Sequence, residues 1–158
     1  INNIFLKKLD NKKIINFLPP EKKDCEYIYN LQNLKKIRDF FINNEVPTIK
    51  DHNLWFNNML KSCDDLILIL NNSRNKKIGF IQISFNKKVF FLSILIDKKY
   101  QNNGFATIVI DILKKVYSKK YNLRAVIHED NKPSLSLFKK NGFSKIKHLN
   151  NKFHIYEY

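Results

Sequence analysis

The chain has 158 residues, 44% of them hydrophobic, and a formal net charge of +15. This length fits a single domain, residues 1–158, with a core large enough to need no disulfide or metal ion for stability. No apolar run is long enough to cross a bilayer and no signal peptide opens the chain, so we predict a cytoplasmic protein with no membrane partner. The two cysteines, Cys25 and Cys63, match no metal or redox spacing, so we expect free thiols and no metal site.

Lysine carries almost all of the positive charge. Among 29 basic residues only Arg38, Arg74 and Arg124 are arginine, the residue that reads bases and grips phosphates in a bidentate fork. Paired lysines, together with abundant asparagine and isoleucine, are what AT-rich codons produce, so a solvated lysine surface explains most of the charge. We therefore predict no nucleic-acid partner, and an acidic or phosphorylated small molecule is the next interpretation.

The first part of the chain favours helices. Apolar residues there recur at spacings of three and four, which is typical of amphipathic helices. Thr48, followed three residues later by Asp51, is a capping-box pattern for the third of them. The predicted elements are an irregular or short extended arm (1–13), a strand (14–19) and three helices (21–33, 33–44 and 48–63). The side chains expected to face the core from the third helix are Leu54, Trp55, Met59 and Leu60.

The second part favours short strands joined by polar turns of two to four residues, the pattern of an antiparallel meander. Gly142 is expected to end the last helix in the left-handed conformation. The predicted order is three strands (65–71, 76–85, 89–97), a helix (105–120), a strand (123–129), a helix (131–141) and a closing hairpin (143–149, 152–158). This order predicts a mixed α+β domain with one central sheet.

The stretch from Tyr100 to Ile110 places one of only three glycines at the start of a predicted helix. The N–H groups of a helix start have no partner within the helix, and they attract anions. Gly104 would let a phosphate approach the main chain closely, where a Cβ atom would clash. The stretch therefore predicts a phosphate-bearing ligand.

Two motifs resemble signatures of the GCN5-related N-acetyltransferase family. The segment Gln101-Asn102-Asn103-Gly104-Phe105-Ala106 matches its acetyl-CoA signature: an arginine or glutamine, two variable residues, a glycine, one variable residue, then a glycine or alanine. A second signature is matched by Asn131, Ser134, Leu137-Phe138 and Gly142-Phe143. Gly79 falls where the family often has an Ile-Gly pair in the preceding strand.

The resemblance implies the family's fold: a mixed, mostly antiparallel central sheet, splayed between its fourth and fifth strands and flanked by helices. It implies acetyl-CoA as cosubstrate, with the pyrophosphate on the loop at Gly104 and the pantetheine in the gap between the splayed strands. A main-chain N–H near Leu95 or Ile96 would polarise the thioester carbonyl. The residues implied to bind acetyl-CoA are Leu95, Ile96, Gln101, Asn102, Asn103, Gly104, Phe105, Ala106, Thr107, Asn131 and Phe138.

Two groups that catalyse the reaction in many members of the family are missing here. Phe138 stands where a tyrosine often protonates the leaving thiolate, and Val126 stands where ribosomal-protein N-terminal acetyltransferases carry a glutamate base. We expect proximity and main-chain polarisation to supply much of the rate. His52 and His128 are the candidate catalytic residues, as bases that keep the amine neutral.

Residues 27–33, Arg38 and 51–56 resemble a subgroup that acetylates nucleotide-linked amino sugars for bacterial surface polysaccharides and pseudaminic-type sugars. His52 and Trp55 are three apart on one helix face, which suits a sugar ring and a phosphate, although Trp55 fits a plain core role equally well. The resemblance implies a phosphorylated small-molecule acceptor bound by Asn33, Arg38, His52 and Trp55. The alternatives are a protein N-terminus, another small amine, or a CoA- or nucleic-acid-binding module that has lost catalysis. Exposed strand edges would permit a homodimer.

Overall fold

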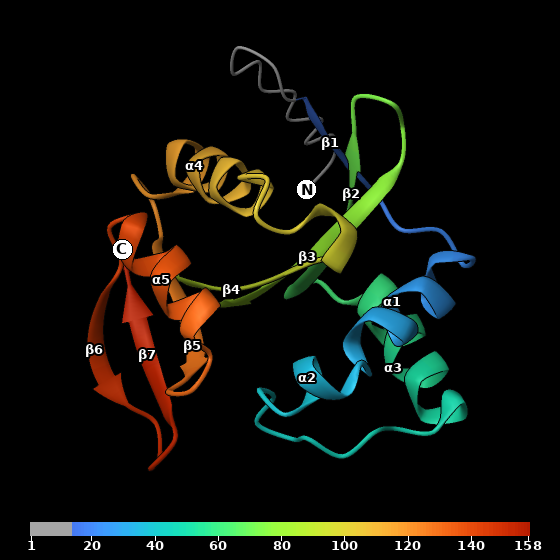
Figure 1. Ribbon diagram of the computed structural model, residues 1–158, viewed down its shortest axis with the longest axis horizontal. Coiled ribbons are helices and arrows are strands. Elements are labelled where there is room, and N and C mark those ends of the chain that lie inside the picture. The colour runs from blue at the N-terminus through green and yellow to red at the C-terminus, as the bar shows by residue number, and fades with distance from the viewer. Residues whose placement is uncertain (1–13) are drawn as a thin grey trace.

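A single seven-stranded sheet forms the centre of the computed structural model, which describes residues 14–158 (Figure 1). The strands lie in the order β1-β2-β3-β4-β5-β7-β6, and only the β4–β5 pair is parallel. Their bounds are β1 (Ile15–Leu18), β2 (Asp65–Asn72), β3 (Lys77–Asn86), β4 (Val89–Ile96), β5 (Asn122–His128), β6 (Ser144–His148) and β7 (Phe153–Glu157). The predicted mixed α+β fold is confirmed, whereas the arm predicted for residues 1–13 lies outside the described residues.

Helices cover both faces of this sheet (Figure 1). They are α1 (Asp24–Gln32), α2 (Lys35–Arg38), α3 (Ile49–Lys61), α4 (Phe105–Tyr117) and α5 (Lys132–Lys140), with a short 3-10 turn at Lys98–Tyr100. None of the helices within residues 14–158 is both long enough and apolar enough to span a membrane.

The core has two parts, one on each face of the sheet. Buried Ile110 and Leu113 of α4 and Phe138 of α5 pack with one set of alternating strand residues. Ile28 of α1 and Phe56 of α3 pack with the other set, which includes Phe80, while Leu95 packs at its margin. Each such side chain contributes about 1.5–3 kcal/mol on burial. We call the second side the α1–α3 face.

The parallel strands β4 and β5 separate after a short stretch of pairing. Their register joins Val89 to Asn122, Phe90 to Leu123 and Phe91 to Arg124, and no further pairing joins them within the part of the chain that the structure describes. The predicted splay between the fourth and fifth strands is therefore present.

Gly79 holds β3 close to β4 beside this opening. Its φ is +155°, and a Cβ atom there would lie 2.1 Å from the carbonyl oxygen of Leu95. A side chain at this position would force the two strands apart. The Ile-Gly pair thus has a steric role next to one of the residues implied to bind acetyl-CoA.

The helix predicted over 33–44 is wrong in most of its length. Only Lys35–Arg38 is helical, and the chain then runs irregularly until α3 begins. Ile42 and Val46 are exposed, at 63% and 59%, so these two side chains do not pack a helix against the rest of the protein. A short helix without such packing is not stable in water.

The third helix begins as predicted but presents a different face to the core. Thr48 caps it, since its Oγ1 accepts a hydrogen bond from the Asp51 N–H at 3.1 Å. Leu54 and Leu60 were expected in the core, yet they are 62% and 42% exposed. The buried residues of α3 are His52, Phe56 and Met59. The apolar spacing of this helix fits more than one face, and contacts with α1 and the sheet select the one that is buried.

Candidate active site

The opening between β4 and β5 brings Leu95 and His128 to the same level. If the β4–β5 register is continued in step from Phe91 and Arg124, His128 falls opposite Leu95. Side chains alternate along strands, and Leu95 packs on the α1–α3 face. The His128 ring lies 5.6 Å from the ring of Phe40, which follows α2, so it faces the same side. The two residues therefore flank the gap on one face of the sheet.

The loop before α4 is built to expose its main chain. Asn102 and Gly104 both have positive φ, +60° and +78°, and Gly104 is the N-cap of α4. A Cβ atom on Gly104 would meet no protein atom within 4 Å, so the space above the helix start is open. No acidic residue lies in the first turn of α4. This open, electropositive helix start fits the pyrophosphate of acetyl-CoA.

The side chains of the loop mainly hold the loop itself. Gln101 Nε2 donates to the carbonyl of Ile96 at 2.8 Å, and Asn103 Nδ2 donates to the carbonyl of Gln101 at 2.9 Å. Gln101, Asn102, Asn103, Gly104 and Thr107 are exposed, whereas Phe105, Ala106 and Ile96 pack against the core.

The two candidates at α5 have different places. Asn131 caps α5, since its Oδ1 accepts a hydrogen bond from the Ser134 N–H at 3.1 Å. Phe138 is 4% exposed and packs edge-on against Phe143, with 5.0 Å between ring centroids. Phe138 therefore belongs to the core and offers no polar group to the gap.

His52 joins α1 to α3. It is 3% exposed, its Nε2 lies 3.0 Å from the carbonyl oxygen of Cys25, and its ring contacts Tyr29 and Trp55. A carbonyl only accepts, so Nε2 carries the proton. Burial lowers the pKa of His52, outweighing the bond to Cys25, so the ring is held neutral. All of these contacts are with α1 and α3, and none is with β4 or β5.

Asn33 and Arg38, the other predicted acceptor residues, lie just before α2 and at its end, close in sequence to Phe40, which contacts His128. The Arg38 guanidinium donates to the carbonyl of Glu45 through both Nε, at 2.8 Å, and Nη2. It thereby ties α2 to the irregular chain that follows. The amide of Asn33 is buried, and neither its Nδ2 nor its Oδ1 has a hydrogen-bond partner within residues 14–158.

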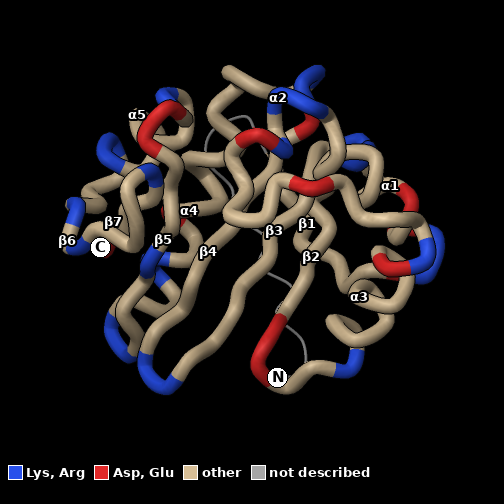
Figure 2. Tube along the Cα trace, turned by 90° about the horizontal axis from the view of Figure 1, so that it is seen from below, with Lys and Arg blue, Asp and Glu red and all other residues tan. Residues whose placement is uncertain are grey.

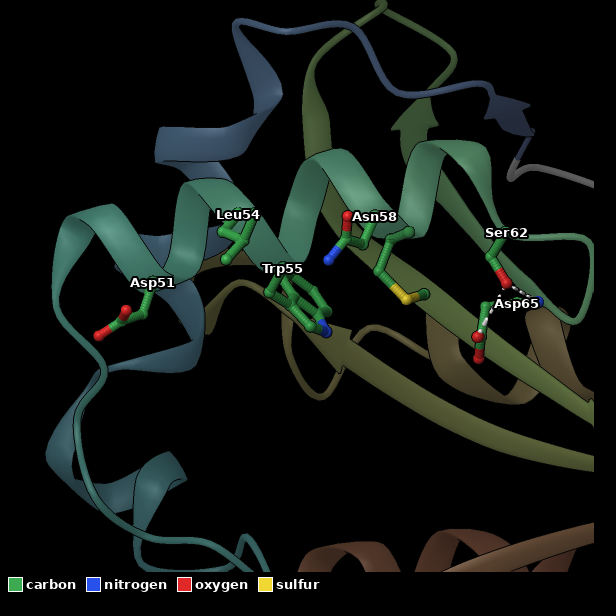
Figure 3. A pocket seen from close by; sticks show the side chains of 7 residues that line it. Asp51, Leu54, Trp55, Asn58, Ser62 and Asp65 are labelled. Atoms are coloured by element: carbon green, nitrogen blue, oxygen red, sulfur yellow. Dashed lines mark hydrogen bonds between the residues drawn. The ribbon is translucent and has the colours of Figure 1, made fainter.

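A hollow of about 390 Å³ runs along α3 (Figure 3). Asp51 and Asp65 lie at opposite ends of the row of side chains drawn there, with Trp55 and Asn58 between them. Asp65 is held by the hydroxyls of Ser62, at 3.0 Å, and Ser84, at 2.5 Å. The residues that line the hollow are Asp51, Leu54, Trp55, Asn58, Met59, Ser62 and Asp65.

Of these lining residues, the sequence identified only Trp55 as a binding residue. Asp65 could not be recognised because it belongs to β2 and meets α3 only in the fold. Phe40, which packs on His128, was missed for the same reason.

Comparison with known proteins identifies the family. The family profile described as "Acetyltransferase (GNAT) domain" matches residues 15–144. A domain from Methanocaldococcus jannaschii DSM 2661 superposes with a TM-score of 0.78 at 25% identity, covering 94% of this chain and 99% of that one. No curated protein sequence matches.

Two other solved structures share the fold at lower identity. The spermidine N-acetyltransferase from Vibrio cholerae, solved with CoA and spermine, has a TM-score of 0.77 and 17% identity, with 90% of this chain and 92% of that chain covered. An acetyltransferase from Thermus thermophilus has a TM-score of 0.77 and 16% identity, with 91% and 96% covered. Given the profile match over most of its length, the chain belongs to the GNAT family and is an N-acetyltransferase that uses acetyl-CoA.

Proposed function

We propose that the protein acetylates the primary amino group of a small, positively charged acceptor. The observation that carries this proposal is the charge of the hollow along α3. It is lined by two carboxylates and a tryptophan and by no lysine or arginine, in a chain with 29 basic residues. An ammonium group is attracted both by carboxylates and by the face of an indole ring.

The hollow lies on the α1–α3 face of the sheet, the face on which Leu95 and His128 flank the gap. Its wall, α3, packs on the α1–α3 face together with Leu95. Asp51 and Asp65 stand at its two ends, which suits an elongated acceptor with more than one amino group (Figure 3). In Figure 2 acidic and basic segments both lie near α2 and α5. The spermine named with the Vibrio cholerae structure is an acceptor of this kind.

The chemistry needs few groups from the protein. Acetyl-CoA, when bound, supplies the acetyl group as an activated thioester. The main chain around Gly104 would hold its pyrophosphate, and the main chain at Leu95 and Ile96 would bind the pantetheine and polarise the carbonyl. The hollow would fix the distal ammonium groups so that one neutral amine reaches the gap.

A nucleotide-linked amino sugar is the second candidate, and the charge of α2 favours it. Lys35, Lys36 and Arg38 make this short helix basic, and it lies next to Phe40 at the gap. A phosphorylated acceptor would use these cations. The two candidates require opposite charges on the acceptor.

Steady-state rates with spermine, a nucleotide-linked amino sugar and a peptide with a free N-terminus separate the candidates. We expect turnover with spermine, and a KM that rises up to about fivefold in Asp51→Asn with kcat unchanged, because an exposed ion pair contributes about 1 kcal/mol at most. Glu26→Gln removes one exposed carboxylate on α1, away from the hollow, and serves as the matched control. Turnover of the nucleotide sugar alone, or equal effects of the two variants, would refute the cationic acceptor.

A further inference from the structure

We propose that His128 is a catalytic hydrogen-bond donor, which polarises the thioester carbonyl from the β5 side of the gap. This assignment rests on the proposed acetyl transfer across the gap, but not on which amine accepts the acetyl group. It differs from the role of base that the sequence predicts for this residue.

The hydrogen bond at Nδ1 decides where the proton of the neutral ring lies. The main-chain N–H of Asp130 donates to Nδ1 of His128 at 3.1 Å. A main-chain N–H can only donate, so Nδ1 holds a lone pair and the neutral ring carries its proton on Nε2. The carboxylate of Asp130 is 3.9 Å from Nδ1, beyond hydrogen-bond distance. A neutral histidine in this form donates from Nε2 and cannot take a proton there.

The Nε2 group is a donor without a protein partner. His128 is 8% exposed, and its ring packs edge-on against Phe153, with centroids 4.9 Å apart and an interplanar angle of 89°. Phe40 contacts it at 5.6 Å. Within residues 14–158 Nε2 makes no hydrogen bond. It is not fully buried, so it still reaches solvent. A fixed, largely buried donor of this kind is prepared to meet an acceptor from outside the protein.

The position of His128 identifies that acceptor. With the β4–β5 register continued from Phe91 and Arg124, it falls opposite Leu95 across the gap, where the main chain of β4 would polarise the thioester carbonyl from the other side. Two donors directed at one developing oxyanion are the arrangement that stabilises acyl-transfer transition states. Phe138 supplies no hydroxyl, so a second donor has more to contribute here than in relatives with a tyrosine.

Protons and bonds balance without a proton transfer by His128. The amine nitrogen forms a bond to the carbonyl carbon, the carbon–sulfur bond breaks, and the sulfur leaves as a thiolate. The proton that the nitrogen loses passes to water. His128 keeps its Nε2 proton throughout, and only its hydrogen bond to the carbonyl oxygen strengthens as negative charge develops there.

The test compares His128→Gln with His128→Leu. The amide of glutamine can donate from about the position of Nε2 but is not a base, and leucine does neither. The first readout is the infrared carbonyl stretch of bound acetyl-CoA labelled with ¹³C at the carbonyl. We expect the band at lower frequency in the wild type and His128→Gln than in His128→Leu. Similar acetyl-CoA affinity in all three proteins, by calorimetry, shows that the fold and the loop at Gly104 are intact.

The second readout is thioester cleavage, measured by thiol release with water and with spermine. We expect His128→Leu to lower the rate about 100-fold, as loss of one oxyanion donor does, and His128→Gln to retain most of it. Equal loss in both variants would identify a base, and no loss in either would exclude a catalytic role. The infrared band and cleavage by water need no acceptor. Failure of spermine as a substrate would therefore count against the cationic acceptor, while these two readouts would still test the role of His128.

The proton position can be read in the free protein. A long-range ¹H–¹⁵N correlation of the imidazole, assigned by its loss in His128→Gln, should show the proton on Nε2 at neutral pH. A proton on Nδ1 would overturn the proposal.

Discussion

Under the proposed function, the two sides of the gap between β4 and β5 would recognise their ligands through different parts of the chain. On the acetyl-CoA side, the side chains of Gln101 and Asn103 bond to the loop itself, and the main chain around Gly104 stays open. On the proposed acceptor side, the surface consists of side chains such as Asp51 and Trp55 of α3 and Asp65 of β2, which the fold brings together.

This difference explains why one side carries a clear motif and the other does not. Main-chain recognition needs particular backbone conformations, here the positive φ of Asn102 and Gly104, and few residues adopt them without strain. Side-chain recognition can be achieved by many residues at many positions, provided that charge and shape agree. Cosubstrate binding therefore restricts the sequence more than acceptor binding does.

The strongest test of main-chain recognition is Gly104→Glu. A glutamate at the N-cap of α4 would place a carboxylate where the pyrophosphate is expected, and would oppose it by charge and by volume. We expect acetyl-CoA affinity, measured by calorimetry, to fall about a thousand-fold, or about 4 kcal/mol.

Gly104→Ala is the matched control for that variant. Alanine introduces the same backbone strain, about 1 kcal/mol, and meets no protein atom within 4 Å. Affinity should fall much less than in Gly104→Glu. If both variants bind acetyl-CoA as the wild type does, the loop is only a connection into a helix, and the contrast between the two sides disappears.

Gly79 tests whether main-chain geometry also sets the β4 side of the gap. In Gly79→Ala the new Cβ would lie 2.1 Å from the carbonyl oxygen of Leu95, a main-chain atom that cannot move without separating the strands. We expect the free energy of unfolding, from urea titration, to fall by about 3 kcal/mol.

Gly142→Ala is the comparison for this variant. Gly142 also has a positive φ, +87°, but its nearest contact is a ring carbon of Tyr158 at 3.2 Å, and a side chain can shift. The free energy of unfolding of Gly142→Ala should fall by about 1 kcal/mol, from backbone strain alone. Equal losses in the two variants would show that strain, rather than the close approach of β3 and β4, explains the role of Gly79.

The features predicted best from the sequence are those that depend on neighbouring residues in the chain. All seven strands were found, because short apolar runs between polar turns leave few alternatives. Thr48 was recognised as a helix cap because a cap needs only neighbours in sequence. The splay was implied by the family motifs, and the end of β4–β5 pairing after Phe91 agrees with it.

The features that depend on distant contacts were not predictable in this way. The helical pattern at 33–44 is locally good, but α2 ends at Arg38 because the exposed Ile42 and Val46 have nothing to pack against. The same limit hid the hollow along α3 and the contact between Phe40 and His128. The proposed acceptor site is built from such contacts, so it could be found only in the structure.

His52 gives the smallest effect, and it tests whether the acceptor side is pre-formed by buried side chains. Its pKa is lowered mainly by burial, so below its ordinary value of about 6.5 the unfolded chain takes up a proton that the folded protein refuses. The free energy of unfolding should therefore fall as pH drops through that range. His52→Gln can still donate to the carbonyl of Cys25 but does not titrate.

Urea unfolding of both proteins at about pH 7.5 and about pH 5 measures this contribution. Wild type should lose more stability between the two values than His52→Gln, whatever the stability of the variant at neutral pH. His154, whose pKa is also lowered by burial and by Lys145 and His148, is present in both proteins and cancels. If both proteins lose the same amount, His52 is free to take up a proton in the folded state. It would then regain the role of a candidate base, on α3.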